Sequence, residues 1–240
     1  MFSLKTHLYP HIQKTYERVL DILFPPICVS CTAPIQDQKK YICADCFNKI
    51  TINTTYTCPA CGKRSAGKNR CHQTAYQLAA ACQYHEPIPQ LIQYLKYKHL
   101  QEIHTLLAAI LIVHIQRTTT DVRSYVISYI PLHSKKERER GFNQSHLLAQ
   151  TIANYFEIPC IATLRRTRYT ESQTKQKDRH QRYYNMINCF DSIAPEEISG
   201  KNILLIDDVS TSGATMHEAA KTLRKYHPRR ITGAVIAKAE

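Results

Sequence analysis

The 240-residue sequence lacks any long hydrophobic segment. Its longest purely apolar run is Leu106–Val113, far shorter than the ~20 residues that a helix needs to span a bilayer. The first 24 residues carry charged and histidine side chains and do not resemble a secretory signal. We therefore expect a soluble, cytoplasmic protein without a transmembrane segment, and its length suits one main domain with a small appendage.

The sequence is also poor in acidic residues. Asp and Glu together number 19 against 32 Lys and Arg, which gives a formal net charge of +13. Such an excess attracts polyanions, including nucleic acid, phosphates or an acidic membrane face. The alternative is that the basic residues only keep the protein soluble. Net charge alone does not distinguish polyanion binding from this role.

Cysteine, in contrast, is abundant, with ten residues. Disulfides are not expected in a reducing compartment, so these thiols need another explanation. The first two pairs are each separated by two residues, which lets both thiolates of a tight turn face one metal ion. Two pairs complete the tetrahedral shell of a structural zinc ion, and we assign it to Cys28, Cys31, Cys43 and Cys46.

A second cysteine set follows and is incomplete. Cys58, Cys61 and Cys71 supply three thiolates, and His72 is an adjacent fourth ligand with awkward geometry. The alternatives are a shared arrangement with the first set, or a loop that no longer binds metal. The isolated Cys82 and the two later cysteines are expected to be small buried residues.

In the rest of the sequence, short apolar segments alternate with amphipathic segments. We predict strands over 125–131, 160–164, 202–206 and 231–239, and helices over 10–24, 144–156 and 216–226. We predict a charged loop over 133–143 and a basic segment without periodicity over 165–185. Strands that alternate with helices indicate an α/β fold with a mainly parallel sheet covered on both faces.

The predicted domain organisation has three parts. An N-terminal helix occupies residues 1–26, a zinc-ribbon domain residues 27–75, and the α/β domain residues 76–240. The last part includes a linker helix over 88–116, which is either continuous or broken near Lys98.

The segment 202–215, "NILLIDDVSTSGAT", carries the clearest chemistry. An apolar strand leads to Asp207 and Asp208 at its carboxyl end, where parallel sheets bind ligands. A loop of small residues then opens a helix, and its backbone N–H groups and the helix dipole favour a phosphate. The two carboxylates suit ribose hydroxyls and water-bound Mg²⁺. We assign phosphate contacts to Ser210, Thr211, Ser212, Gly213, Ala214 and Thr215.

Other readings of this segment are less favoured. A Walker loop requires a Gly-Lys-Ser/Thr sequence that is not present, and the single glycine excludes a dinucleotide-binding fingerprint. A solvated acidic turn followed by an ordinary helix cap remains the structural alternative.

The string "LLIDDVSTSGAT" resembles the signature of type I phosphoribosyltransferases that bind phosphoribosyl pyrophosphate (PRPP). The whole chain is similar to the ComF family of competence proteins, of the ComFC type. "LFPPICVSC", "IPQLIQYLKYKH", "IPLHSKKERERGFNQSHLLA" and "RRTRYTESQTKQKDRHQRYYNM" carry the resemblance along nearly the whole length.

The resemblance implies a zinc ribbon joined to a type I phosphoribosyltransferase-like domain with a parallel sheet flanked by helices. It also implies a role in natural transformation, where single-stranded DNA is handled in the cytoplasm together with other components such as a competence helicase. Asp207 and Asp208 would be the catalytic pair that contacts ribose, with Mg²⁺ and PRPP as cofactor and ligand. Leu132, His133, Lys135 and Arg140 would face pyrophosphate.

The basic segment 165–185 offers a second binding surface. Seven cations stand there against two carboxylates, and tyrosines interleave them, which is the composition that single-stranded DNA binding requires. The candidates are Arg165, Arg166, Arg168, Lys175, Lys177, Arg179 and Arg182. The alternative is a mobile basic loop that closes over PRPP.

Two functions of different class therefore remain. In the first, the phosphoribosyltransferase-like fold serves as an adaptor for single-stranded DNA, with PRPP bound or sensed. In the second, the protein is an active Mg-dependent transferase that acts on a nucleobase or related acceptor, with charge stabilisation dominating catalysis.

Overall fold

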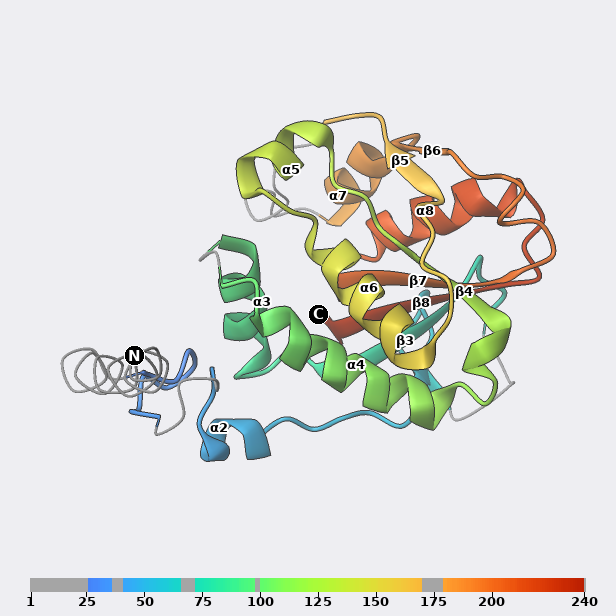
Figure 1. The fold of residues 1–240 in the computed structure, drawn as a ribbon. Helices are drawn as coiled ribbons and strands as arrows, with labels where there is room; N and C mark the ends of the chain where they lie inside the picture. The colour runs from blue at the N-terminus through green and yellow to red at the C-terminus, as the bar shows by residue number, and fades with distance from the viewer. Residues whose placement is uncertain (1–25, 36–40, 66–71, 98–99, 170–178, 240) are drawn as a thin grey trace, which may run out of the picture. The chain divides into compact units, whose positions relative to one another are not determined.

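The computed structural model describes residues 26–35, 41–65, 72–97, 100–169 and 179–239. The chain divides into two compact units, Met1–Lys49 and Ile50–Glu240, whose elements are shown in Figure 1. The helix predicted over 10–24 lies outside the described residues. Among the helices of the described part, none combines the length and apolar character needed to cross a membrane.

The described residues of the first unit, 26–35 and 41–49, include a tight turn and one short helix. The amide of Cys28 donates to the carbonyl of Ala33, and this bond closes the turn that holds the first cysteine pair. Helix α2 (Ala44–Asn48) begins at Cys43, whose Sγ accepts a hydrogen bond from the amide of Cys46. Both cysteine pairs therefore occupy turns that direct their thiols to one side, as the predicted zinc site requires.

The second unit is organised by a mixed sheet. Four adjacent strands of this sheet are parallel, in the order β3 (Gln77–Gln83), β8 (Arg230–Lys238), β7 (Asn202–Ser210) and β4 (Tyr125–Tyr129), with β4 at one edge. The antiparallel hairpin β1 (Tyr56–Thr57) and β2 (Arg64–Ser65) extends the sheet beyond β3. Strand β8 is buried along most of its length because it lies inside a parallel sheet. This arrangement confirms the predicted α/β class.

Helices cover both faces of this sheet (Figure 1). On one face, α4 (Ile103–Thr118) and α6 (Gln144–Phe156) pack against each other and the strands, and α3 (Ile88–Tyr97) packs on α4. On the other face lies α8 (Ala214–Arg224), which α7 (Arg179–Met186) and the two-stranded sheet β5 (Leu164–Arg166) and β6 (Phe190–Ser192) contact. Alternate residues of β7 face each layer, with Ile203 and Leu205 in the α8 core.

The linker region contains two helices, because α3 ends at Tyr97 and α4 begins at Ile103. The broken alternative is thus confirmed, and the single helix over 88–116 is wrong. The strand predicted over 160–164 is displaced. Cys160 forms an isolated parallel bridge with Ile127, and the strand itself begins at Leu164.

Two loop predictions also need correction. The segment 133–143 contains helix α5 (Ser134–Arg140), which begins after His133 and ends at Gly141 with φ +83°. None of its residues is buried, so it has no apolar periodicity that a sequence pattern could detect. The segment 165–185 includes most of β5 and α7 rather than irregular chain throughout. A short 3-10 helix, Val122–Ser124, precedes β4.

Candidate functional site

The two aspartates lie within β7, not beyond it as predicted. The strand continues to Ser210, and its pairing with β8 places Asp207 opposite Val235. Neighbouring β4 ends earlier, since Tyr129 pairs with Ile206. Both carboxylates therefore extend past the end of β4 while their backbone remains fixed by β8, at the edge where parallel sheets bind ligands.

Asp207 is buried and held by two donors. The hydroxyl of Ser145 donates to its Oδ1 at 2.8 Å, and the amide of Asp208 donates to the same oxygen at 2.9 Å. Burial and the neighbouring Asp208 charge raise the pKa of Asp207 to about 7, against the opposing effect of Ser145 and Lys96. Burial therefore favours the protonated form of this carboxyl more than in an exposed aspartate.

Asp208 forms a buried ion pair that the sequence did not reveal. The ammonium of Lys96, in the last turn of α3, lies 2.5 Å from Asp208 Oδ2, and the two side chains are 18% and 4% exposed. The amide of Val209 donates to the other oxygen at 2.8 Å. Burial alone would lower the pKa of Lys96, but the charge and hydrogen bond of Asp208, together with the nearby Asp207 and Tyr97, outweigh burial and raise that pKa. Lys96 therefore supplies a fixed positive charge beside both carboxylates.

The loop after β7 leads into α8, and we refer to residues 211–213 with the first turn of α8 as the predicted anion cradle. Gly213 adopts φ +78°, which turns the chain into α8, and a Cβ at this position would lie 3.6 Å from the hydroxyl of Tyr76. The Ser212 hydroxyl accepts a long bond, 3.4 Å, from the amide of Ala214. Gly213 has no side chain with which to cap α8, and a helix N-terminus without such a cap favours an anion through its first-turn amides and the helix dipole.

The segment after β4 is organised around Asn143. Its side-chain oxygen accepts hydrogen bonds from the amides of Ser145 and His146 at the start of α6, and its amide donates to the Ile130 carbonyl at the end of β4. Asn143 thus fixes the turn that delivers Ser145 to Asp207. The motif "GFNQS" therefore connects directly to the aspartate pair.

Three of the four residues predicted to face pyrophosphate contact other side chains or amides of the protein. His133 caps α5 by accepting from the Lys135 amide, and the Lys135 ammonium lies 4.9 Å from the centre of the Tyr169 ring. Arg140 donates to Gln144 at 2.5 Å and lies 5.4 Å from the ring of Tyr97. Leu132 is half-buried and leads into α5.

The basic segment divides into surface and interior cations. Arg165 and Arg168 are exposed, and Arg168 donates to the carbonyl of Asn185. Arg166 is half-buried over Phe190, and burial lowers its pKa. Lys175 and Lys177 lie outside the described residues, and so do the side chains of Arg179 and Arg182.

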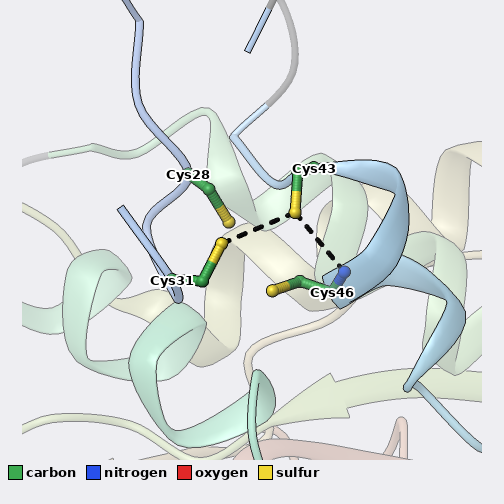
Figure 2. Close-up of side chains that lie close together, drawn as sticks. All are labelled: Cys28, Cys31, Cys43 and Cys46. Carbon is green, nitrogen blue, oxygen red and sulfur yellow. Dashed lines mark hydrogen bonds between the residues drawn. The ribbon is translucent and has the colours of Figure 1, made fainter. Parts of the chain in front are cut away.

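The first cysteine set converges as predicted (Figure 2). The sulfur atoms of the four cysteines all lie within 4.8 Å of one another, with Cys31 and Cys43 separated by 3.6 Å. Sulfurs around one tetrahedral zinc ion lie about 3.8 Å apart, so the set fits this metal. Burial opposes ionisation of Cys28, but amide donors at Ser30, Cys31 and Cys43 lower its pKa to about 6. A metal-binding thiolate benefits from such donors.

The second set assembles around a histidine. Cys58, Cys61 and His72 offer two sulfurs and one ring nitrogen within 4.8 Å, and Cys58 Sγ lies 3.6 Å from His72 Nδ1. Cys71 lies outside the described residues. The turn that carries Cys58 and Cys61 connects β1 to β2, so this set belongs to the sheet of the second unit.

Comparison with protein families identifies both parts of the chain. Residues 19–75 match the double zinc ribbon domain, and residues 143–240 match the phosphoribosyl transferase domain. The first match crosses the division between the compact units at Lys49, and its second cysteine set lies on the β1–β2 hairpin of the second unit.

Named relatives cover most of the chain. DNA utilization protein YhgH from Escherichia coli O157:H7 is 30% identical over 211 residues, which is 83% of this chain and 91% of that protein. Competence protein F from Haemophilus influenzae is 27% identical over 82% of this chain and 90% of its own length. Competence protein ComFC from Bacillus subtilis is 27% identical over 78% of both chains.

Among solved structures, the glutamine PRPP amidotransferase from B. subtilis aligns with 61% of this chain and 30% of its own, at 16% identity and a TM-score of 0.42. The sequence relatives carry the assignment, since 30% identity extends over nearly all of the YhgH chain. With its zinc ribbon and phosphoribosyl transferase domain, this chain belongs to the ComF family of competence proteins.

Proposed function

We propose that this protein serves competence and DNA utilization by handling single-stranded DNA in the cytoplasm, and that its β7–α8 site binds PRPP with Mg²⁺. The names of its relatives support the cellular role, and the match to the phosphoribosyl transferase domain supports the ligand. The observation that carries the proposal is the position of two buried carboxylates near the end of β7, a few residues before the loop that leads into α8.

The chemistry of the ligand follows from this arrangement. The amides that begin α8 and the hydroxyls of Thr211 and Thr215 suit the 5-phosphate of a sugar phosphate. Asp207 and Asp208 accept hydrogen bonds from vicinal ribose hydroxyls at a spacing fixed by β7. The site therefore favours a phosphate that is attached to a diol. Inorganic phosphate would make the contacts at the start of α8 but none of the hydroxyl contacts to the two carboxylates.

The aspartate pair also fits Mg²⁺. Carboxylates, substrate phosphates and waters are the ligands that this ion prefers, and bound Mg²⁺ would neutralise charge on a departing pyrophosphate. Lys96 already holds a positive charge beside Asp208. We expect the ion and Lys96 to compete for this carboxylate, so Mg²⁺ alone binds weakly and the ligand supplies its remaining contacts.

Calorimetric titration tests the ligand. Purified wild-type protein is titrated with PRPP in Mg²⁺, together with the double variant Asp207→Ala/Asp208→Ala and the control Asp191→Ala, an exposed carboxylate on β6. We expect saturable binding by the wild type and the control and none by the double variant. Absence of binding by the wild type, or equal binding by the double variant, would contradict a PRPP site here.

The DNA role is assigned to the surface around Arg165 and Arg168. Both cations are exposed, and Tyr169, Tyr183 and Tyr184 nearby in the sequence are 40%, 44% and 69% exposed, which provides rings on which bases can stack. The affinity for single-stranded DNA and its salt dependence are measured by the fluorescence anisotropy of a labelled oligothymidylate at several salt concentrations. The double variant Arg165→Ala/Arg168→Ala should weaken binding and flatten its salt dependence, whereas Arg123→Ala, on the 3-10 helix before β4, should not.

Transfer to an acceptor is the alternative function of the same site. Pyrophosphate release from PRPP, measured with each nucleobase in turn, separates an enzyme from an adaptor that only binds. Base-dependent release that disappears in the Asp207→Ala/Asp208→Ala variant would establish a transferase.

A further inference from the structure

A polar cavity lies beside the β7–α8 loop, with Thr211 and Ser212 in its lining. It encloses about 930 Å³ in the unit Ile50–Glu240, beyond the carboxyl ends of three parallel strands. Lys238 ends β8, Tyr84 and His85 follow β3, and Thr211 and Ser212 follow β7. The cavity therefore shares one wall with the anion cradle and extends away from it towards the β3 edge of the sheet.

The opposite wall is the second cysteine turn. Cys61, Gly62 and Arg64 line it, and the amide of Gly62 donates to the Cys58 carbonyl within that turn. Gly62 has φ +75°, and a Cβ there would lie 3.1 Å from the Lys238 ammonium. The ammonium therefore lies against the second cysteine turn, which forms part of the cavity lining.

The lining has the charge of an anion site. Arg64, Lys238 and His85 contribute basic groups, and the described residues around the cavity include no Asp or Glu. Tyr84 is 39% exposed at the rim, where it offers a flat ring, and Asn53 and Gln83 add amide groups. Cations next to an aromatic ring and amides suit a ligand that combines a phosphate with a planar base.

We propose that this cavity binds a nucleotide unit, with its phosphate at Arg64 and Lys238 and its base near Tyr84. This nucleotide would be a second ligand, next to a ribose phosphate bound at the β7–α8 site. The proposal rests on the proposed function only in that it places the nucleotide beside that site. A free mononucleotide and a nucleotide within a DNA strand share this chemistry. The volume accommodates one such unit, because ligand pockets of about 300–1,000 Å³ are typical for small molecules.

Binding of two probes tests the proposal. Thymidine 5′-monophosphate and a thymidine pentanucleotide are titrated into the full-length wild type, Arg64→Gln, Lys238→Gln and the control Arg230→Gln. Arg230 is exposed at the first position of β8, at the opposite end of the strand from Lys238, which makes it a matched cation. A charged hydrogen bond lost from a phosphate weakens binding by about tenfold or more, so we expect this loss in the two cavity variants and none in the control.

The two probes distinguish the source of the ligand. Similar affinity for both indicates a free mononucleotide, and much tighter binding of the pentanucleotide with the same loss in Lys238→Gln indicates a DNA strand. No binding of either probe at millimolar concentration, or equal binding by the cavity variants and the wild type, would overturn the proposal.

A further variant separates this inference from the proposed function. Asp207→Asn/Asp208→Asn removes the charges for ribose and Mg²⁺ and does not touch the cavity lining. It should lose PRPP and keep the thymidine nucleotide. If the wild type binds the nucleotide but not PRPP, the ribose-phosphate proposal fails and the cavity proposal stands. If the wild type binds PRPP but not the nucleotide, only the cavity proposal is refuted.

Discussion

Replacement of Asp207 by asparagine is expected to stabilise the unliganded protein at alkaline pH while it removes PRPP affinity. Asparagine keeps an oxygen that can accept from both Ser145 and the Asp208 amide, so the two hydrogen bonds at Oδ1 survive. What disappears is a negative charge that is buried beside a second carboxylate. The raised pKa means that this charge is disfavoured in the folded state even with Lys96 nearby.

The size of the effect follows from proton linkage. The pKa of Asp207 rises from 3.8 to about 7, and each unit corresponds to about 1.36 kcal/mol, which gives about 4 kcal/mol. Between these two values the folded state holds a proton that the unfolded state has lost, so the stability of the wild type falls as pH rises from about 4 to about 7 and then levels off. The expected advantage of the variant is about 2 kcal/mol at about pH 5.5 and about 4 kcal/mol at about pH 8.

Urea unfolding followed by circular dichroism at both pH values measures this difference, and other titrating groups cancel between variant and wild type. Asp191→Asn serves as the control, because Asp191 is exposed on β6 and its variant should show no such pH trend. An Asp207→Asn variant that is less stable than the wild type at about pH 8, or whose advantage does not grow with pH, would refute the assignment of a strained buried charge.

Three further predictions concern other parts of the site. Lys96→Met leaves a buried carboxylate without its cation and should lower the free energy of unfolding by about 3–5 kcal/mol at neutral pH, measured by urea unfolding; a neutral effect would contradict the ion pair. Ser145→Ala removes the hydroxyl that lowers the pKa of Asp207, so the pH midpoint for PRPP binding should move upward in calorimetry, and an unchanged midpoint would argue against this contact. Cys46→Ala should reduce bound zinc by one ion per chain in elemental analysis, whereas Cys82→Ala, a buried thiol on β3, should not; equal zinc contents would contradict the four-cysteine site.

The α/β class and the cysteine site could be predicted because their signals are local. A buried parallel strand appears as a short apolar run, and paired cysteines specify a metal turn without reference to the rest of the fold. The turn from β7 into α8 could also be predicted, since a stretch of small residues separates an apolar strand from an amphipathic helix, whereas its role in phosphate binding stays a prediction. Helix α5 was missed because it lies on the surface with no buried residue to mark its period.

The contacts that define the site come from distant elements and were not visible in the sequence. Lys96 and Ser145 reach the aspartate pair from α3 and α6, and only the packing of these helices on the sheet brings them there. One signal was available for Lys96, which follows buried Ile92 by one helical turn and so places a cation on an apolar face. The second cysteine turn lines a cavity because β1 pairs with β3. The spacing of the cysteines in the sequence does not predict this long-range pairing.

The most direct measurement of the central claim is hydrogen exchange of the full-length protein with and without PRPP and Mg²⁺. Mass spectrometry of peptides that cover residues 207–217 reports on the amides at the start of α8. We predict slower exchange there on ligand addition, no change in the peptide over 121–129, and loss of the protection in Asp207→Ala/Asp208→Ala. Protection that is absent from this loop, or that appears only around residues 165–169, would contradict a ribose-phosphate site at the end of β7.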